Sequence, residues 1–165
     1  MLPTVIIDTR EQHELPFNNL HIQRGNTLPT IRKKLDVGDY SFVGYEDIIM
    51  IERKSVNDLY GTVLGGHERF KRELERAKNH KWKYLVIEST PGALYDYCRM
   101  FRDFRKYNQI IKILFKWASE YDLRVRWTGN REDASDLIAR IGIYLMEAKN
   151  VSRKENQESV LPVAP

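Results

Sequence analysis

The chain has 165 residues, of which 42% are hydrophobic and 30% charged, the size and composition of one globular domain. Its single cysteine, Cys98, excludes an internal disulfide framework and a zinc site built on cysteines, and it fits a reducing compartment. The net charge of +4 is mild, so it permits a polyanionic partner without establishing one.

No segment has the unbroken apolar length of a membrane span, and the N-terminus lacks the features of a secretory signal. We therefore expect no membrane association and an intracellular protein: in the cytoplasm of a prokaryote or a phage-infected host, or in the nucleus of a eukaryote.

The first third of the chain predicts short strands separated by turns. A β-branched run at residues 5–7 predicts a buried strand that ends in the polar cluster Asp8-Thr9-Arg10-Glu11. Residues 12–30 are punctuated by proline and glycine and are typical of a loop. Further strands are expected around residues 31–35, over residues 37–43 and, after a turn, over residues 48–54.

Helices and strands alternate in the rest of the chain. Ser55 followed by Asp58 resembles a capping box, so a helix should begin there and end at Gly65-Gly66. Later segments predict helices over about 68–79, 110–121 and 134–145, and strands over 84–87 and 124–127. We predict an α/β domain with a mixed β-sheet flanked by α-helices over residues 1–150, followed by a flexible C-terminal tail over residues 151–165.

Two carboxylates and a lysine are predicted to meet where two strands pair. Side chains alternate along a strand, so Glu52 and Lys54 should point to one face and Arg53 to the other. The twelve residues between Asp39 and Glu52, with a turn in their middle, suit two adjacent antiparallel strands. Such a pairing would bring the carboxylates of Asp39 and Glu52 close together in space, where they would repel each other unless a cation lies between them. Oxygen ligands favour hard ions, so we expect one or two magnesium or manganese ions.

A metal held by carboxylates beside a lysine suits hydrolysis of a phosphodiester bond. The metal lowers the pKa of its bound water, while the lysine orients that water or stabilises the developing charge. Aspartate followed by Glu-x-Lys is also common on solvated surface strands. The charged run here, however, ends a strongly apolar strand, and Asp8, Arg10 and Glu11 end the first strand in the same way.

Several blocks of the chain resemble the XPF/Hef-type nucleases of the PD-(D/E)XK superfamily. Residues 5–11 resemble the opening strand of that family, residues 38–40 its Gly-Asp-Tyr, residues 52–58 its Glu-Arg-Lys-x-x-x-Asp signature, and residues 84–88 a later strand. The order and spacing agree over about residues 4–90, and more loosely to about residue 147.

The resemblance implies a restriction-endonuclease-like fold and a nuclease domain that cuts DNA with magnesium or manganese. Its substrates would be branched, flapped or otherwise irregular DNA in repair, recombination or replication. DNA is the expected partner, a homodimer is allowed, and no small-molecule cofactor is expected. The residues that the resemblance assigns to catalysis are Asp39, Glu52, Lys54, Arg53, Asp8 and Glu11, and those it assigns to the metal are Asp39, Glu52 and Asp8.

The resemblance also implies supporting roles. Arg53 would contact phosphate or brace the acidic groups from the far side of its strand, and Glu11 would complete the acidic cluster. Asp58 would hydrogen-bond Arg53 or Lys54, or act as a negative charge at a helix N-terminus. The residues expected to contact DNA are Arg10, Arg53, His67, Arg69, Arg99 and Arg102.

Many members of the family carry a tandem helix-hairpin-helix module after the nuclease. Only a short tail follows the last predicted helix here, so we expect a compact, nuclease-only member. Two alternatives remain: a non-catalytic DNA-binding or scaffold subunit with the same fold, and a junction-resolving or restriction-type nuclease. The presence of Asp39, Glu52 and Lys54 together argues against the non-catalytic subunit.

The segment 97–106 interleaves aromatic and basic residues. As a helix it would place Tyr97, Phe101 and Phe104 on one face and Arg99, Arg102 and Lys106 on another. We favour an aromatic stripe that faces the core, with a solvated basic face. Stacking on single-stranded DNA would require exposed aromatic rings.

Overall fold

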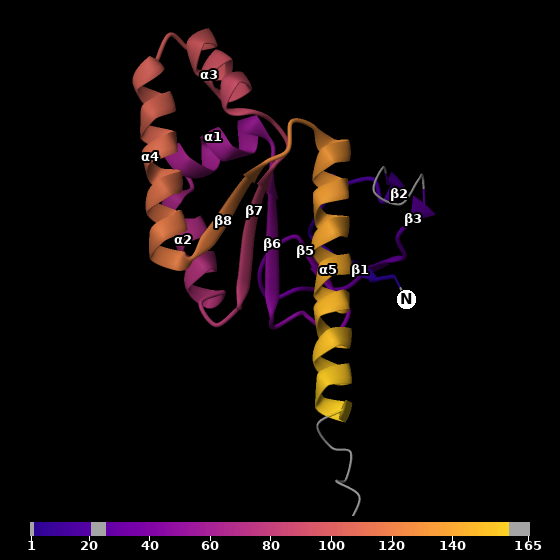
Figure 1. The fold of residues 1–165 in the computed structure, drawn as a ribbon. Helices are drawn as coiled ribbons and strands as arrows, with labels where there is room; N and C mark the ends of the chain where they lie inside the picture. The colour runs from indigo at the N-terminus through magenta and orange to yellow at the C-terminus, as the bar shows by residue number, and fades with distance from the viewer. Residues whose placement is uncertain (1, 21–25, 159–165) are drawn as a thin grey trace, which may run out of the picture.

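The computed structural model describes residues 2–20 and 26–158. Its centre is a six-stranded sheet with a two-stranded ribbon beside it (Figure 1). From edge to edge the sheet contains β4 (Thr30–Arg32), β1 (Val5–Ile7), β5 (Tyr40–Phe42), β6 (Ile49–Lys54), β7 (Trp82–Ile87) and β8 (Leu123–Trp127). The ribbon pairs β2 (Asn18–Leu20) with β3 (Asn26–Thr27).

The sheet is mixed, as predicted. Strand β5 is antiparallel to both of its neighbours, β1 and β6, whereas β6, β7 and β8 run parallel to one another. Tyr40 faces Ile51 across the β5–β6 pair, so the residues just before β5 lie beside the carboxyl end of β6. The predicted antiparallel pairing of the two site strands is therefore confirmed.

Helices cover both faces of the sheet (Figure 1). One face packs against α1 (Val56–Leu64), α2 (His67–Arg76), α3 (Pro91–Met100) and α4 (Phe104–Tyr121), whose apolar side chains form a core with Met50, Leu85 and Ile87. The other face packs against α5 (Arg131–Glu158), with a second core around Ile49, Ile51 and Val86. The α/β class, with a mixed sheet flanked by helices, is confirmed.

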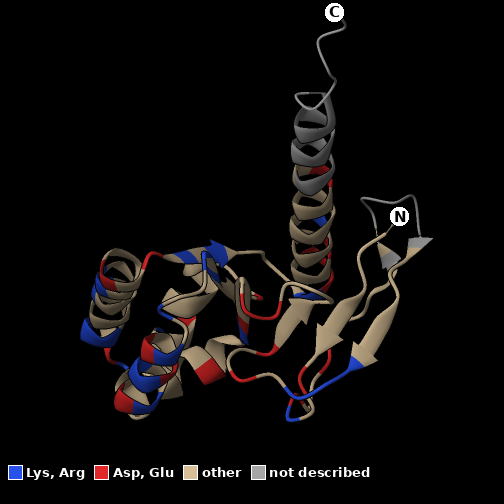
Figure 2. Cartoon of the chain, turned by 90° about the horizontal axis from the view of Figure 1, so that it is seen from below, with Lys and Arg blue, Asp and Glu red and all other residues tan. Residues whose placement is uncertain are grey.

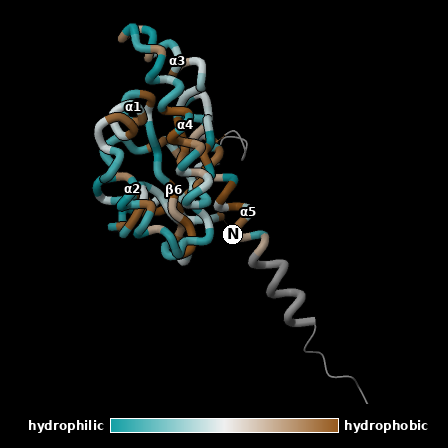
Figure 3. The backbone as a smooth tube through the Cα atoms, turned by 90° about the vertical axis from the view of Figure 1, so that its left-hand side faces the viewer, coloured by the Kyte–Doolittle hydropathy of each residue, from teal (hydrophilic) through white to brown (hydrophobic). Residues whose placement is uncertain are grey.

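Side-chain caps set where two of these helices begin. The Ser55 hydroxyl accepts a hydrogen bond from the N–H of Asp58 at 3.1 Å, so the predicted start of α1 is confirmed. Thr90 caps α3 in the same way, with Pro91 as its first residue, where a missing N–H costs nothing. Hydrophobic and hydrophilic residues alternate along the helices in Figure 3, as helices with one buried side require.

Helix α5 lies very close to β5. A Cβ on Gly142 would stand 2.4 Å from the ring of Phe42, so only glycine permits this approach. The helix also extends to Glu158, past the predicted domain boundary at residue 151. The flexible tail over residues 151–165 stays a prediction, and residues 159–165 lie outside the described part of the chain. Among the described residues, no helix has the length and apolar character to cross a membrane.

Candidate active site

The two carboxylates and the lysine that were predicted to meet come together at the carboxyl end of β6. Glu52 and Lys54 lie on the face of the sheet that α1 and α2 cover, and their side chains form an ion pair. Asp39 immediately precedes β5, and its N–H donates to the carbonyl oxygen of Ile51 at 2.9 Å. Its Oδ2 accepts from the backbone N–H of Arg53, also at 2.9 Å. The sheet register therefore holds the Asp39 carboxylate beside the Glu52–Lys54 pair.

Gly38 makes this close approach feasible. Its φ of +75° lies in the left-handed region, and a Cβ there would stand 2.9 Å from the carbonyl oxygen of Ile51. Any other residue would push the chain away from β6 and displace the neighbouring Asp39 carboxylate.

A third carboxylate, Glu73, was not predicted. It lies on α2, and its Oε1 accepts a hydrogen bond from the N–H of Gly38 at 3.0 Å. Its charge also acts on Asp39, Glu52 and Lys54. The sequence of α2 gives no indication of this contact, because Glu73 is one of several charged residues on an amphipathic helix.

Burial and like charge shift the proton equilibria of these groups. Burial is the main cause that raises the pKa of Glu52 to about 8, and the neighbouring Asp39 adds to it. Burial also raises the pKa of Asp39 to about 6, against the opposing hydrogen bond from Arg53. Burial alone would lower the pKa of Lys54, but the carboxylates of Glu52 and Asp39 outweigh it and raise that pKa. The ion pair with Glu52 and the charge of Asp39 therefore favour the cationic form of Lys54, while burial and mutual repulsion oppose full ionisation of the two carboxyl groups.

Arg53 lies on the opposite face of β6, as strand alternation predicts. Its side chain is 6% exposed, and the guanidinium pairs with Glu88 at the end of β7 and stands 3.9 Å from Glu11. Arg131 of α5 approaches Glu88 to 3.7 Å and donates to the backbone of residues 13 and 14. Of the two roles expected for Arg53, the structure favours the brace, because a DNA phosphate would first have to open a buried ion pair.

The acidic residues at the end of β1 have other partners. Both carboxylate oxygens of Asp8 accept hydrogen bonds, from Arg10 and from the N–H of Leu35 at 2.6 Å. These bonds outweigh burial and lower the pKa of Asp8. Glu11 accepts from the N–H of His13 and lies with Arg53 on the far face. The structure thus gives Asp8 a role in holding the segment before Asp39, and its predicted metal contact gains no support.

The remaining predicted residues separate into two groups. Asp58 binds the hydroxyl of Ser55 rather than Arg53 or Lys54, and the ring of His67 stacks on Trp117 at 5.2 Å. Arg69 is exposed and lines a cavity of about 380 Å³ that Lys54 also lines. Asp58 lines the same cavity, so both Arg69 and Asp58 lie next to the site, whereas His67 has a structural contact.

The other predicted DNA contacts are exposed arginines outside the site itself. Arg10 is held by Asp8, and Arg99 on α3 lies 3.7 Å from Asp96. Arg102 follows α3. Lysine and arginine are interspersed with aspartate and glutamate over the helices in Figure 2, so charge alone does not mark one DNA-binding face.

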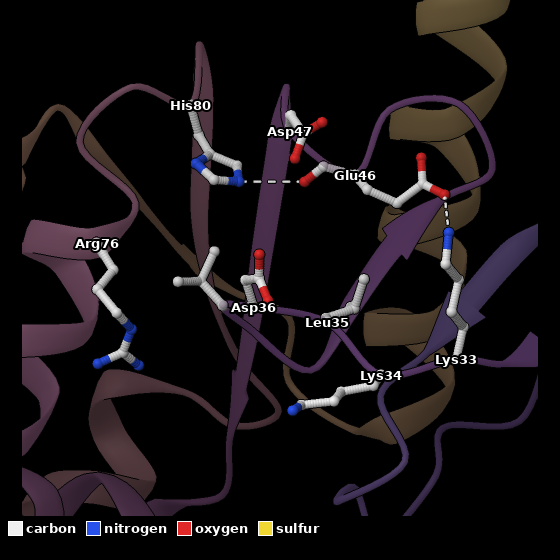
Figure 4. A pocket seen from close by; sticks show the side chains of 9 residues that line it. Lys33, Lys34, Leu35, Asp36, Glu46, Asp47, Arg76 and His80 are labelled. Carbon is white, nitrogen blue, oxygen red and sulfur yellow. Dashed lines mark hydrogen bonds and ion pairs between the residues drawn. The ribbon is translucent and has the colours of Figure 1, made fainter.

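A cavity of about 700 Å³ lies beside the segment that leads into Asp39 (Figure 4). Within it, Lys33 pairs with Glu46 at 2.8 Å, and Nε2 of His80 lies 3.1 Å from the Glu46 carbonyl oxygen. Charged side chains of both signs line this cavity, but Asp39, Glu52 and Lys54 do not. The lining residues are Lys33, Lys34, Leu35, Asp36, Val37, Glu46, Asp47, Arg76 and His80.

Asp39 and Glu52 are the two carboxylates of the site that could hold a divalent metal ion. Within the described residues, no three His, Cys, Asp or Glu side chains already form a ligand group. Magnesium is usually bound by one or two carboxylates together with waters and substrate phosphates, so two carboxylates would be enough to hold it. In the structure, the Lys54 ammonium provides the positive charge next to Glu52.

The fold and the site define an α/β domain with a carboxylate–lysine centre at the ends of two antiparallel strands. The chain matches the ERCC4 domain over residues 7–141 and belongs to that family. A comparison with curated proteins finds no match.

Solved structures share the fold. XPF from Aeropyrum pernix superimposes with a TM-score of 0.68 and 20% sequence identity, over 92% of this chain and 69% of that chain. XPF from Aeropyrum pernix in complex with DNA gives a TM-score of 0.60 and 19% identity, over 98% of this chain and 68% of that chain.

Proposed function

We propose that the protein is a divalent-metal-dependent DNA endonuclease that acts on branched, flapped or otherwise irregular DNA. The observation that carries this proposal is the convergence of Asp39, Glu52 and Lys54 at one end of the β5–β6 pair. Membership of the ERCC4 domain family and the likeness to a fold seen in complex with DNA support it.

In this proposal Asp39 and Glu52 hold magnesium or manganese, and Lys54 contributes positive charge. The metal, when bound, supplies a water of lowered pKa and neutralises charge on the phosphate. Because the two carboxylates keep Lys54 protonated, it acts as a hydrogen-bond donor that orients the attacking water and stabilises negative charge. The hydrogen bonds from Arg53 to Asp39 and from Gly38 to Glu73 hold the carboxylates in place before substrate arrives.

The test is cleavage of flap, fork, four-way junction, single-stranded and plain duplex DNA with magnesium or manganese. Asp39→Ala and Lys54→Ala should each abolish cleavage, while the exposed controls Asp36→Ala and Lys78→Ala should cut normally. Unchanged cleavage by both Asp39→Ala and Lys54→Ala would refute the assignment of this site as catalytic. Calorimetric titration with manganese should show binding to the unaltered protein and loss of that binding in Asp39→Ala.

The same assays separate the alternatives. If the protein binds DNA but neither cuts it nor binds manganese, it is a non-catalytic DNA-binding subunit. If it cuts only four-way junctions, it is a junction-resolving nuclease, and if it cuts only plain duplex, it is a restriction-type enzyme. Pairing of two copies stays a prediction, which sedimentation velocity tests directly.

A further inference from the structure

An exposed aromatic surface lies beside the candidate active site. Phe101, just after α3, is 56% exposed, and its ring stacks on Tyr60 of α1, with a centroid distance of 5.7 Å and an interplanar angle of 27°. Tyr97 stands against both rings, at 5.2 Å from Phe101 and 5.3 Å from Tyr60. Phe104 is 50% exposed, so the predicted core-facing stripe is wrong at both phenylalanines. Neighbouring side chains hold Phe101 on one face and leave much of its ring open to solvent.

Positive charge surrounds these rings. Four cations (Arg99, Arg102, Arg105 and Lys106) lie on or next to the turn between α3 and α4, against the two carboxylates of Asp96 and Asp103. The Nζ atom of Lys106 is 5.5 Å from the centroid of Tyr60. The ion pairs with the two aspartates are long, at 3.7 Å, and accessible to solvent, and the four cations outnumber the two carboxylates, so the surface stays cationic.

The surface is continuous with the site. The hydroxyl of Tyr97 donates to Oδ1 of Asn57 at 2.6 Å. Asn57 and Tyr60 line the cavity of about 380 Å³ that Lys54 and Arg69 also line. Helices α1 and α3 lie side by side in Figures 1 and 3 and are in contact. This cavity, whose lining also includes the carboxylate of Asp58, and the Tyr97–Asn57 hydrogen bond connect Lys54 to the aromatic cluster that contains Phe101.

We propose that this surface, formed by Tyr60, Tyr97, Phe101 and the cations around them, binds a single-stranded DNA arm that leaves the active site, with a base stacked on Phe101. The inference rests on the proposed function and adds to it a path for the unpaired strand. Exposed aromatic rings among cations suit unpaired DNA, because every base has a stacking face and every linkage a negative charge. A duplex offers the charge but keeps its bases stacked on one another.

Binding is measured without cleavage, by fluorescence anisotropy of a labelled oligothymidylate in EDTA. Phe101→Ala should weaken binding about 5- to 160-fold, since one base–aromatic stack contributes about 1–3 kcal/mol. Phe101→Trp should retain or increase affinity because it keeps an aromatic face. Phe115→Ala, which removes a 72% exposed ring from α4 outside this surface, should bind as the unaltered protein does. Equal affinity of Phe101→Ala and Phe115→Ala would overturn the proposal.

A second measurement separates this inference from the proposed function. On substrates with an unpaired arm, Phe101→Ala should raise KM with little change in kcat. If the unaltered protein cuts nothing, the proposed function fails, whereas the anisotropy series still decides the single-strand surface. If Phe101→Ala instead changes the sedimentation coefficient of the DNA-free protein, the surface is a contact between protein copies and the inference is wrong.

Discussion

The backbone N–H of Arg53 donates to Oδ2 of Asp39 at 2.9 Å. Arg53, which lies between Glu52 and Lys54 in the sequence, therefore also orients the Asp39 carboxylate beside them. The donor belongs to the main chain of a central strand, which is paired on both sides. The separation of the two carboxylates is therefore set mainly by sheet register, with little dependence on side-chain freedom.

Glu73 should act as a positioning residue through its hydrogen bond to Gly38. Glu73→Gln keeps an oxygen that accepts this bond, whereas Glu73→Leu removes it and releases the loop that carries Asp39. We expect Glu73→Leu to lower kcat about 10- to 100-fold, as loss of a supporting contact at a metal site commonly does, and Glu73→Gln to lose much less. Kinetics at several manganese concentrations check this.

The matched control is Glu68→Gln on the exposed first turn of the same helix, which should match the unaltered protein. If Glu73→Gln proves as weak as Glu73→Leu, the negative charge of Glu73 matters more than its hydrogen bond, and the positioning role is refuted.

The metal-free protein should lose stability as pH rises. The pKa of Glu52 is raised from 4.5 to about 8 in the folded chain, so the folded state holds its proton more strongly than the unfolded state does. The free energy of unfolding in EDTA should accordingly fall from about pH 5 to about pH 8, by at least about 1 kcal/mol. Thermal unfolding across this range measures the effect.

Glu52→Gln cannot ionise, so it should flatten this pH dependence and raise Tm at the alkaline end. Manganese should raise Tm of the unaltered protein more at the alkaline end than at the acidic end. A metal-free protein that becomes more stable between these pH values would contradict the raised pKa of Glu52.

The Arg53–Glu88 pair should be a major determinant of stability. Arg53→Met leaves the nearly buried carboxylate of Glu11 without its cation and leaves Glu88 only the longer contact with Arg131, which should cost about 3–5 kcal/mol. Lys116→Met breaks the exposed pair with Glu120 on α4, and it should cost less than about 0.5 kcal/mol. Urea unfolding with unchanged m-values compares the two. Similar costs for both variants would mean that Arg53 does not brace the sheet.

The close contact of α5 with β5 should make Gly142 sensitive to one methyl group. Gly142→Ala places a Cβ 2.4 Å from the Phe42 ring and should destabilise the fold by about 1–3 kcal/mol. Gly61→Ala, in α1, meets no atom within 4 Å and should stabilise it by about 0.4–1 kcal/mol, because alanine restricts the unfolded chain. Thermal unfolding should show a lower Tm for Gly142→Ala and a higher Tm for Gly61→Ala. A Tm change of the same sign in both variants would refute the close contact between Gly142 and Phe42.

Local rules were enough to predict much of the site from the sequence. Alternation along a strand separates Glu52 and Lys54 from Arg53, and a turn of suitable length after Asp39 pairs its strand with theirs. The cap at Ser55 follows from residues three positions apart. Each of these features depends on neighbours in the chain or in one pair of strands, and residue order encodes both.

Only the tertiary structure decided the partners that come from distant elements. Glu73 reaches Gly38 because α2 packs over the end of β6, and Arg131 joins Glu88 because α5 crosses the opposite face. The exposure of Phe101 depends on where α3 ends relative to α1, which helical spacing does not determine. Periodicity shows that a helix has an apolar face, but the packing of other helices decides which part of that face stays open to solvent.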